Sequence, residues 1–445
     1  MSNSASSNNK KQETAPRGIT TISVRGYKSL YDECRLEIRP LTILAGANSS
    51  GKSSAMQPLL LLKQTLEASY DPGPLLLNGP NVRFNSAEQL FSRLTEKNIT
   101  DNFIIKLSAD SELFLADTFE KHSKKGIELA EMEYSEGNSK GILRLEASHK
   151  KMDPLEDKAL KDLYKTFSIK ENEPLEIGIV RSRCFFGFEL HYQGRSLGIL
   201  NPSDAFNTHI RRIVHVPGLR GNPERTYKTS AIGSEFSGTF ENYVASVINH
   251  WQITEDHRLK DLQSSLQTLG LTRKVEAKQV NDTQVELRVS RLPFGNGNGA
   301  KDMVSIADVG FGVSQILPVL VALLTAEPGQ LVYLEQPEIH LHPRAQVALA
   351  KILADAANRG VRVVAETHSS LLLLGIQALV AEKRLAPEKV KLHWFKRRDD
   401  GATEITSADL DEAGAFGDWP EDFADVDLET ESRYLDAAEL RRGMR

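Results

Sequence analysis

The stretch LTILAGANSSGKSS, residues 41–54, decides how the chain folds. Its first residues include the apolar, β-prone run Leu41, Ile43 and Leu44, and helix-forming residues continue after the stretch to about Glu67. Between them the chain reads G-x-x-x-x-G-K-S, which is the spacing of a P-loop between a strand and a helix. A glycine-rich turn that arose by chance would lack this context. We therefore predict a nucleoside triphosphate site at this loop.

Each residue type in the loop has a physical task. Gly46 and Gly51 permit positive φ angles, so backbone amides can close on phosphate oxygens beside the helix N-terminus. Lys52 would bridge the β- and γ-phosphates of ATP, and the Ser53 hydroxyl would ligate Mg²⁺. The predicted nucleotide-binding residues of this loop are Gly46, Asn48, Ser49, Ser50, Gly51, Lys52, Ser53 and Ser54.

The composition of the chain limits its class. Its 445 residues are enough for two or three lobes, and a net charge of -5 gives no global basic field for nucleic acid. Cys34 and Cys184 lie far apart without metal-ligand spacing, so we expect both to be reduced. No apolar run reaches the ~20 residues that span a bilayer. Residues 1–17 are polar without a signal-peptide core, so we expect a disordered tail on a cytoplasmic protein.

A second set of motifs lies late in the chain. The apolar run 331–334 ends in Glu335, and a predicted helix over 345–358 leads to another apolar run, 361–365. An acidic residue at the end of a buried strand can hold Mg²⁺ beside a P-loop, as a Walker B element requires. His368, just after the second run, would sense or orient the γ-phosphate. The alternative is a core histidine that is merely hydrogen-bonded.

Two further loops carry groups suited to phosphate. The sequence DVGFGVSQ contributes Gly310, Gly312 and Ser314 before a predicted buried helix, and a glycine loop at a helix start suits an anion. The sequence PGLRGNPERTY contributes Arg220 and Arg225, whose guanidinium forks match phosphate oxygens. Structural ion pairs with carboxylates are the alternative for both arginines.

Four motifs follow one another along the chain: GANSSGKSS, DVGFGVSQ, LVYLEQPEIHLHP and VVAETHS. In this order they resemble the split ATPase head of the ABC class that SMC, RecF and OLD-type proteins share. They resemble in particular the bacterial single-head AAA-type ATPases found with anti-phage and mobile-element systems. The resemblance covers about residues 18–90 and 210–425, including PGLRGNPERTY and GDWPEDF. It implies an α/β fold, an ABC-type P-loop NTPase head with a mixed sheet core and helices.

Alternating apolar patterns between about Thr100 and Leu200 predict an antiparallel β-rich lobe inserted into this head. OLD-type nucleases carry a Toprim domain after the head, with an Asp-x-Asp motif that binds catalytic metals. Asp425-Val426-Asp427 fits this motif but lies close to the end of the sequence, so we expect no such domain. The predicted division is a tail (1–17), the P-loop part of the head (18–99), the inserted lobe (100–210), the part with signature, Walker B and histidine (211–428) and a charged helical tail (429–445).

By this resemblance, two copies form a homodimer head to tail around two ATP molecules. Ser314 and the amides from Gly310 to Gly312 of one subunit would meet the γ-phosphate that Lys52 of the other subunit holds. ATP would then close the dimer, and hydrolysis would open it. A glutamine between the lobes of ABC-type ATPases reaches Mg²⁺, and Gln89 is the candidate here; a surface helix residue is the alternative.

The chain departs from the resemblance at the end of the Walker B strand. Where many ABC heads have Asp-Glu, this sequence has Glu335-Gln336. Gln336 can position a water but cannot take its proton, so Glu338 or another base must act, or this ATPase will be slow. The predicted catalytic residues are Glu335, which also holds Mg²⁺, Gln336, Glu338 and His368.

Two functions are compatible with these motifs. The first is a nucleotide-gated ATPase switch that controls a separate effector protein, a nuclease or toxin, in bacterial anti-phage defence. The second is a RecF-like DNA-binding ATPase in repair or maintenance. The slight acidity and the lack of a long basic run favour the first. A basic groove assembled from Arg211, Arg212, Arg220 and Lys228 would favour the second. We expect no membrane partner.

Overall fold

The computed structural model describes residues 18–95, 98–110, 112–122, 126–137, 139–145, 150–151, 176–193, 195–291, 302–417, 432–436 and 438. Several predicted features lie outside the described residues. They are the tail before residue 18, the GDWPEDF segment beyond Gly417, the run from Asp425 to Asp427, and most of residues 429–445.

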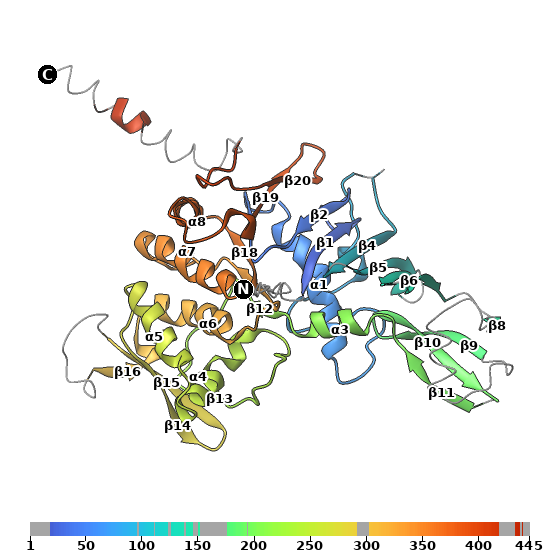
Figure 1. Cartoon of the computed structure of the whole chain (residues 1–445), viewed down its shortest axis with the longest axis horizontal. Coiled ribbons are helices and arrows are strands. Elements are labelled where there is room, and N and C mark those ends of the chain that lie inside the picture. The colour runs from blue at the N-terminus through green and yellow to red at the C-terminus, as the bar shows by residue number, and fades with distance from the viewer. Residues whose placement is uncertain are drawn as a thin grey trace, which may run out of the picture.

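A mixed sheet forms the centre of the molecule, with the strand order β12-β17-β18-β3-β19-β20 (Figure 1). Its strands are β3 (Leu41–Gly46), β12 (Val214–Val216), β17 (Leu331–Glu335), β18 (Arg362–Thr367), β19 (Val390–Arg397) and β20 (Thr403–Ala408). Neighbouring strands are parallel except β19 and β20. Parallel strands bring their carboxyl ends to one edge, so the residues that end β3, β17 and β18 meet there. The predicted α/β class is confirmed.

Helices cover both faces of this sheet. On one face, a single hydrophobic core joins Leu41 and Ile43 of β3 to helices α4 (Val244–Ile253), α5 (Arg258–Thr268), α6 (Phe311–Thr325), α7 (Pro343–Asn358) and α8 (Ser370–Ala381). Leu44 faces the other core, which contains α1 (Lys52–Glu67) and α3 (Asp204–Arg211). Because β3 is buried at every residue, its sequence shows no period-two alternation, and the polar Thr42 is buried along with its apolar neighbours.

A six-stranded antiparallel sheet packs beside α1, in the order β2-β1-β4-β5-β6-β7. Its strands are β1 (Ile19–Arg25), β2 (Cys34–Glu37), β4 (Asn102–Ala109), β5 (Leu113–His122), β6 (Gly126–Glu136) and β7 (Ser139–Arg144). The predicted antiparallel strands after residue 100 are present, and β4 pairs with β1 along its length. The strands therefore extend the sheet that β1 begins. The domain boundary at residues 99 and 100 remains a prediction.

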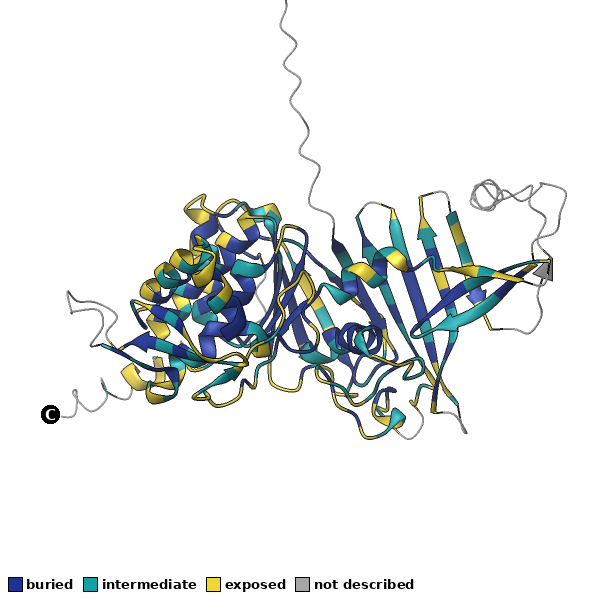
Figure 2. Ribbon diagram, turned by 90° about the horizontal axis from the view of Figure 1, so that it is seen from below, coloured by how far each residue is buried: buried dark blue, intermediate teal, exposed yellow. Residues whose placement is uncertain are grey.

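Two smaller antiparallel sheets complete the described structure. One contains β8 (Lys150–Lys151), β9 (Glu176–Ser182), β10 (Phe185–Tyr192) and β11 (Arg195–Leu200). The other contains β13 (Tyr227–Lys228), β14 (Val275–Asn281), β15 (Gln284–Ser290) and β16 (Met303–Ser305). Short 3₁₀ helices are η1 (Ala87–Gln89), η2 (Phe240–Tyr243), η3 (Ile306–Asp308) and η4 (Pro387–Lys389). Figure 2 shows the helices gathered at one end and the antiparallel strands at the other, with buried residues where the layers meet. None of the helices described is long and apolar enough to cross a membrane.

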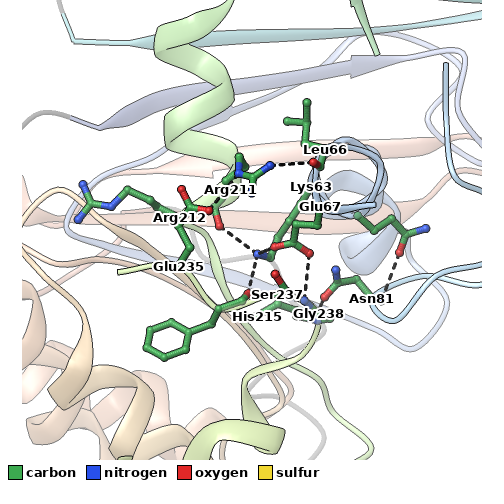
Figure 3. Close-up of polar contacts among 12 residues, drawn as sticks. Lys63, Leu66, Glu67, Asn81, Arg211, Arg212, His215, Glu235, Ser237 and Gly238 are labelled. Atoms are coloured by element: carbon green, nitrogen blue, oxygen red, sulfur yellow. Dashed lines mark hydrogen bonds and ion pairs between the residues drawn. The ribbon is translucent and has the colours of Figure 1, made fainter. Parts of the chain in front are cut away.

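A buried polar junction ties the C-terminal end of α1 to the second half of the chain (Figure 3). Lys63, which is fully buried, forms an ion pair with Glu67 one turn later. Its ammonium also donates hydrogen bonds to the carbonyl oxygens of Arg211 at 3.1 Å and Phe236 at 2.9 Å. Glu67 in turn accepts a hydrogen bond from the Gly238 amide at 3.0 Å. The helix that follows the P-loop is thus fixed at both of its ends.

Candidate nucleotide-binding site

The P-loop between β3 and α1 adopts backbone angles that its glycines permit. Gly46 has a φ of 139° and Gly51 a φ of 108°. A Cβ atom on Gly46 would lie 2.2 Å from the Phe395 carbonyl oxygen, and one on Gly51 would lie 2.4 Å from Thr403 Oγ1. Larger residues are therefore excluded by both conformation and space. The loop is packed against the ends of β19 and β20 and opens at the start of α1.

Lys52 is held inside the loop. Its ammonium donates hydrogen bonds to the carbonyl oxygens of Gly46 at 2.9 Å and Ala47 at 2.7 Å. Burial lowers the pKa of Lys52, while the nearby carboxylates Glu366 and Glu338 act in the opposite direction. The cation that would bridge the phosphates is thus already at the loop, beside acidic groups from two other strand ends.

A pocket of about 550 Å³ opens above the P-loop. It brings together most of the predicted site: Asn48, Ser49, Ser50, Gly51, Lys52, Ser53, Ser54, Gln89, Gln336 and His368. Four cationic side chains, Lys28, Lys52, Arg93 and Arg397, and two acids, Glu88 and Glu366, also line it. The excess of cations suits a polyanion such as a polyphosphate.

Glu366, the penultimate residue of β18, lines this pocket and was not among the residues predicted from the sequence. Its carboxylate accepts a hydrogen bond from Ser53 Oγ at 2.9 Å and another from the Tyr333 hydroxyl. Burial raises the pKa of Glu366 to about 7, although the two hydrogen bonds oppose that shift. One signal was available: Glu366 is the first polar residue after the apolar run of its strand, as Glu335 is after its own.

Glu335, the predicted Mg²⁺ ligand, ends β17 next to Glu366 but is absent from the pocket lining. His215 Nε2 lies 3.1 Å from one carboxylate oxygen, and the Gly218 amide donates to the other at 3.0 Å. Burial would raise the pKa of Glu335, but His215, the Gly218 amide and Arg220 outweigh it and lower the pKa. This carboxylate is therefore ionised. Its hydrogen-bond partners lie on β12 and in the loop after it, on the side of β17 away from β18.

The other predicted catalytic residues differ in their access to the pocket. Gln336 lines it and has a left-handed φ of 44°, a strained conformation that functional sites often retain. His368 lines it too, and burial, followed by the charge of Lys52, lowers the pKa of its imidazole. Glu338 does not line it: one oxygen accepts from Thr367 Oγ1 at 2.6 Å and from the His368 amide at 3.0 Å, and the other is buried without a partner among the described residues.

The predicted signature loop lies at the start of α6, away from this pocket. Gly310 precedes the helix, Gly312 and Ser314 lie in its first turn, and none of the three lines the pocket. The Ser314 hydroxyl donates to the Phe311 carbonyl oxygen at 3.0 Å. Within one chain, the structure does not bring the signature loop to the P-loop.

The two arginines of PGLRGNPERTY have structural partners. Arg220 is buried and donates to the carbonyl oxygens of Gln315 at 3.1 Å and Glu335 at 2.8 Å. Arg225 forms an ion pair with Asp308 at 2.9 Å. Arg225 therefore has the ion pair that the structural alternative predicts, whereas Arg220 is held by backbone carbonyl oxygens and links the end of β17 to the start of α6.

Gln89 ends η1 and lines the pocket, where its side-chain oxygen accepts a hydrogen bond from the Asn85 amide at 2.9 Å. The amide group is therefore oriented by its own loop. Within the residues described, no group of three or more histidine, cysteine or acidic side chains could hold a metal ion alone.

Two family models match the segments that carry these motifs. "AAA ATPase domain" matches residues 18–180, and "AAA domain, putative AbiEii toxin, Type IV TA system" matches residues 222–374. The P-loop lies in the first match, and the signature loop, Glu335 and His368 lie in the second. These matches support an ATPase of the AAA type. No curated protein matches the chain.

Heads of SMC proteins are among the solved structures that match this chain. The SMC head bound to the C-terminal winged-helix domain of ScpA is 12% identical, with a TM-score of 0.46 over 89% of this chain and 99% of that one. The SMC head from Thermotoga maritima is 11% identical, with a TM-score of 0.40 over 87% and 98%. The head with an extended coiled coil derived from Pyrococcus furiosus is 10% identical, with a TM-score of 0.44 over 95% and 100%.

Proposed function

We propose that this chain binds ATP with Mg²⁺ and hydrolyses it slowly, acting in the cytoplasm as a nucleotide-gated homodimeric switch. The observation that carries the proposal is the pocket, in which the P-loop, four cationic side chains and the polar ends of neighbouring strands face one cavity. Lys52 would leave the loop carbonyls for the phosphate oxygens, which offer it a full opposite charge.

The residues at this edge suit magnesium. The Ser53 hydroxyl and the carboxylates of Glu366 and Glu335 are hard oxygen donors, the kind that Mg²⁺ prefers. Since the described residues contain no self-sufficient metal cluster, the remaining ligands would be phosphate oxygens and water. A bound cation would neutralise charge that develops on the phosphates.

Slow hydrolysis follows from the residues that face the γ-phosphate end. Gln336 lines the pocket and can orient a water through its amide, but it cannot take a proton. His368 lines the same cavity and would hydrogen-bond the γ-phosphate. The candidate base Glu338 holds the start of the Thr367-His368 turn and has one unpaired buried oxygen.

The gating part of the proposal rests on the contacts of Arg220. Its guanidinium joins the β17 end to α6, and Gln315 Nε2 returns a hydrogen bond to the Arg220 carbonyl oxygen at 3.3 Å. The state of the pocket edge would thus reach Ser314, which is half-buried, and Phe311, which is 54% exposed. In the homodimer, Gly310, Gly312 and Ser314 would contact the partner's nucleotide.

A separate effector protein, a nuclease or toxin in anti-phage defence, would recognise the closed dimer. The description of the family model over residues 222–374, which mentions a toxin–antitoxin system, supports this class of role. DNA binding of the RecF type is the second candidate. It is less favoured because Arg211 pairs with Glu235, Arg212 pairs with Glu327, and Arg220 is buried, which leaves the proposed basic groove largely neutralised.

The test compares ATP binding and dimer formation in the wild type and three variants. Lys52→Ala should weaken ATP affinity at least about 100-fold, because a charge-assisted phosphate contact is lost. Lys351→Ala, at an exposed ion pair on α7, is the control and should bind ATP normally. Light scattering should show a dimer for the wild type only with non-hydrolysable ATP, and a monomer for Ser314→Arg. Equal ATP binding by Lys52→Ala and the wild type would refute the nucleotide site.

A further inference from the structure

Two carboxylates end adjacent parallel strands beside the P-loop. Glu335 of β17 and Glu366 of β18 are partners in the strand register, so either could serve a cation there. The position of Glu335 at the end of a Walker B strand favours it on sequence grounds. The hydrogen bonds of the two side chains favour the other carboxylate, Glu366.

Both oxygens of Glu335 already have donors. His215 Nε2 lies 3.1 Å from Oε1, and the Gly218 amide donates to Oε2 at 3.0 Å. These partners lie on β12 and in the loop that follows it, on the side of β17 away from β18 and the P-loop strand. Glu335 also does not line the pocket.

Glu366 lies one strand closer to the P-loop, because β18 is hydrogen-bonded directly to β3. Its Oε2 accepts a hydrogen bond from Ser53 Oγ at 2.9 Å, and Glu366 lines the pocket. A serine hydroxyl that donates its only proton to a carboxylate keeps its oxygen lone pairs available for a cation. Glu366 therefore holds the Ser53 hydroxyl in an orientation that leaves its oxygen available to bind a metal ion.

We propose that Glu366, and not Glu335, is the carboxylate that acts with Ser53 on the Mg²⁺ of the bound nucleotide. This inference rests on the proposed function. Glu335 is then a positioning residue: it holds His215, whose ring is stacked on Tyr333 with centroids 5.3 Å apart, and Tyr333 donates to the other oxygen of Glu366. A chain of contacts therefore runs from Glu335 through His215 and Tyr333 to Glu366.

The test measures how much Mg²⁺ strengthens nucleotide binding. The dissociation constant of a fluorescent ATP analogue is measured with Mg²⁺ and with EDTA, and Mn²⁺ binding in the presence of ADP is followed by electron paramagnetic resonance. Glu366→Gln should keep metal-free nucleotide affinity within about threefold of the wild type, because Gln retains hydrogen bonds to Ser53 and Tyr333, and should lose the metal-dependent strengthening at least about tenfold. Glu335→Gln should retain most of that strengthening. Glu404→Gln, an exposed carboxylate on β20, is the control and should match the wild type.

Glu366→Asp provides a second reading with the charge kept. Withdrawing the carboxylate by one methylene from Ser53 should also reduce the metal-dependent strengthening, by about fivefold or more. Thermal denaturation shows which variants are folded, and the prediction applies to whichever of the two Glu366 variants folds. Full strengthening in that variant, or a loss confined to Glu335→Gln, would overturn the inference. A wild type that binds no nucleotide even with EDTA would instead refute the proposed function.

Discussion

Glu366 and Asp117 are both carboxyl groups removed from water, yet their surroundings differ. Glu366 is 3% exposed and has two hydroxyl donors, Ser53 and Tyr333, at the edge of a pocket. Asp117 of β5 is fully buried, and neither of its oxygens has a hydrogen-bond partner among the described residues. Burial raises the pKa of both groups, to about 7 for Glu366 and well above the ordinary value for Asp117. Burial alone therefore does not identify a functional carboxyl group; the donors and the access to a cavity do.

The topology of the two sheets explains this difference. Glu366 lies near the carboxyl end of a parallel strand, where loops and helix starts supply hydroxyls and amides. Asp117 lies in mid-strand, where β4 and β6 on either side use their backbone groups for pairing with β5. Its side chain shares the core with apolar neighbours, and Cys184 is close enough for Asp117 to raise the pKa of its thiol, after burial. The carboxyl group of Asp117 thus lowers the stability of the antiparallel sheet.

The largest expected effect comes from removing the cationic partner of a buried carboxylate, Glu67. In Lys63→Ala, Glu67 would lose its buried ion-pair partner and keep only the Gly238 amide, so the free energy of unfolding should fall by about 3–5 kcal/mol. Lys351→Ala removes the same kind of i,i+4 pair from an exposed site on α7 and should cost less than about 0.5 kcal/mol. Urea unfolding measures both. Equal losses in the two variants would show that the junction of Figure 3 contributes no more than a surface pair.

The sequence predicted the loop beside Glu366, but neither of these two carboxyl groups was singled out from it. The P-loop spacing predicted a loop between a strand and a helix, because the motif itself requires both around it, and residues 48–54 of this loop line the pocket. Glu366 was overlooked because its place beside the P-loop depends on β18 lying between β17 and β3. The spacing of residues within a motif does not determine the order of strands in a sheet. Asp117 could have been found: period-two alternation places it on the same face as the buried Leu115 and Phe119.

A smaller effect of opposite sign is expected when Asp117 is replaced by an apolar side chain. Asp117→Val should raise the free energy of unfolding at pH 5 by about 2 kcal/mol, because an unpaired buried polar group is exchanged for a β-branched side chain suited to a strand. The measurement is urea unfolding beside the wild type. Nucleotide binding should not change, since Asp117 does not line the pocket. A loss of stability would mean that Asp117 has a partner that stabilises it.

The smallest effect separates the ionisation of Asp117 from its packing. Because burial raises the pKa of Asp117, the folded chain retains a proton that the unfolded chain releases above its ordinary pKa of about 3.9. Between these two pKa values, the free energy of unfolding falls as the pH rises. Asp117→Asn removes this linkage, so the advantage of the variant over the wild type should grow between pH 5 and pH 6, by at most about 1.4 kcal/mol. Urea unfolding at the two pH values measures this growth, and parallel stability profiles would show that Asp117 ionises as readily in the folded chain as in the unfolded one.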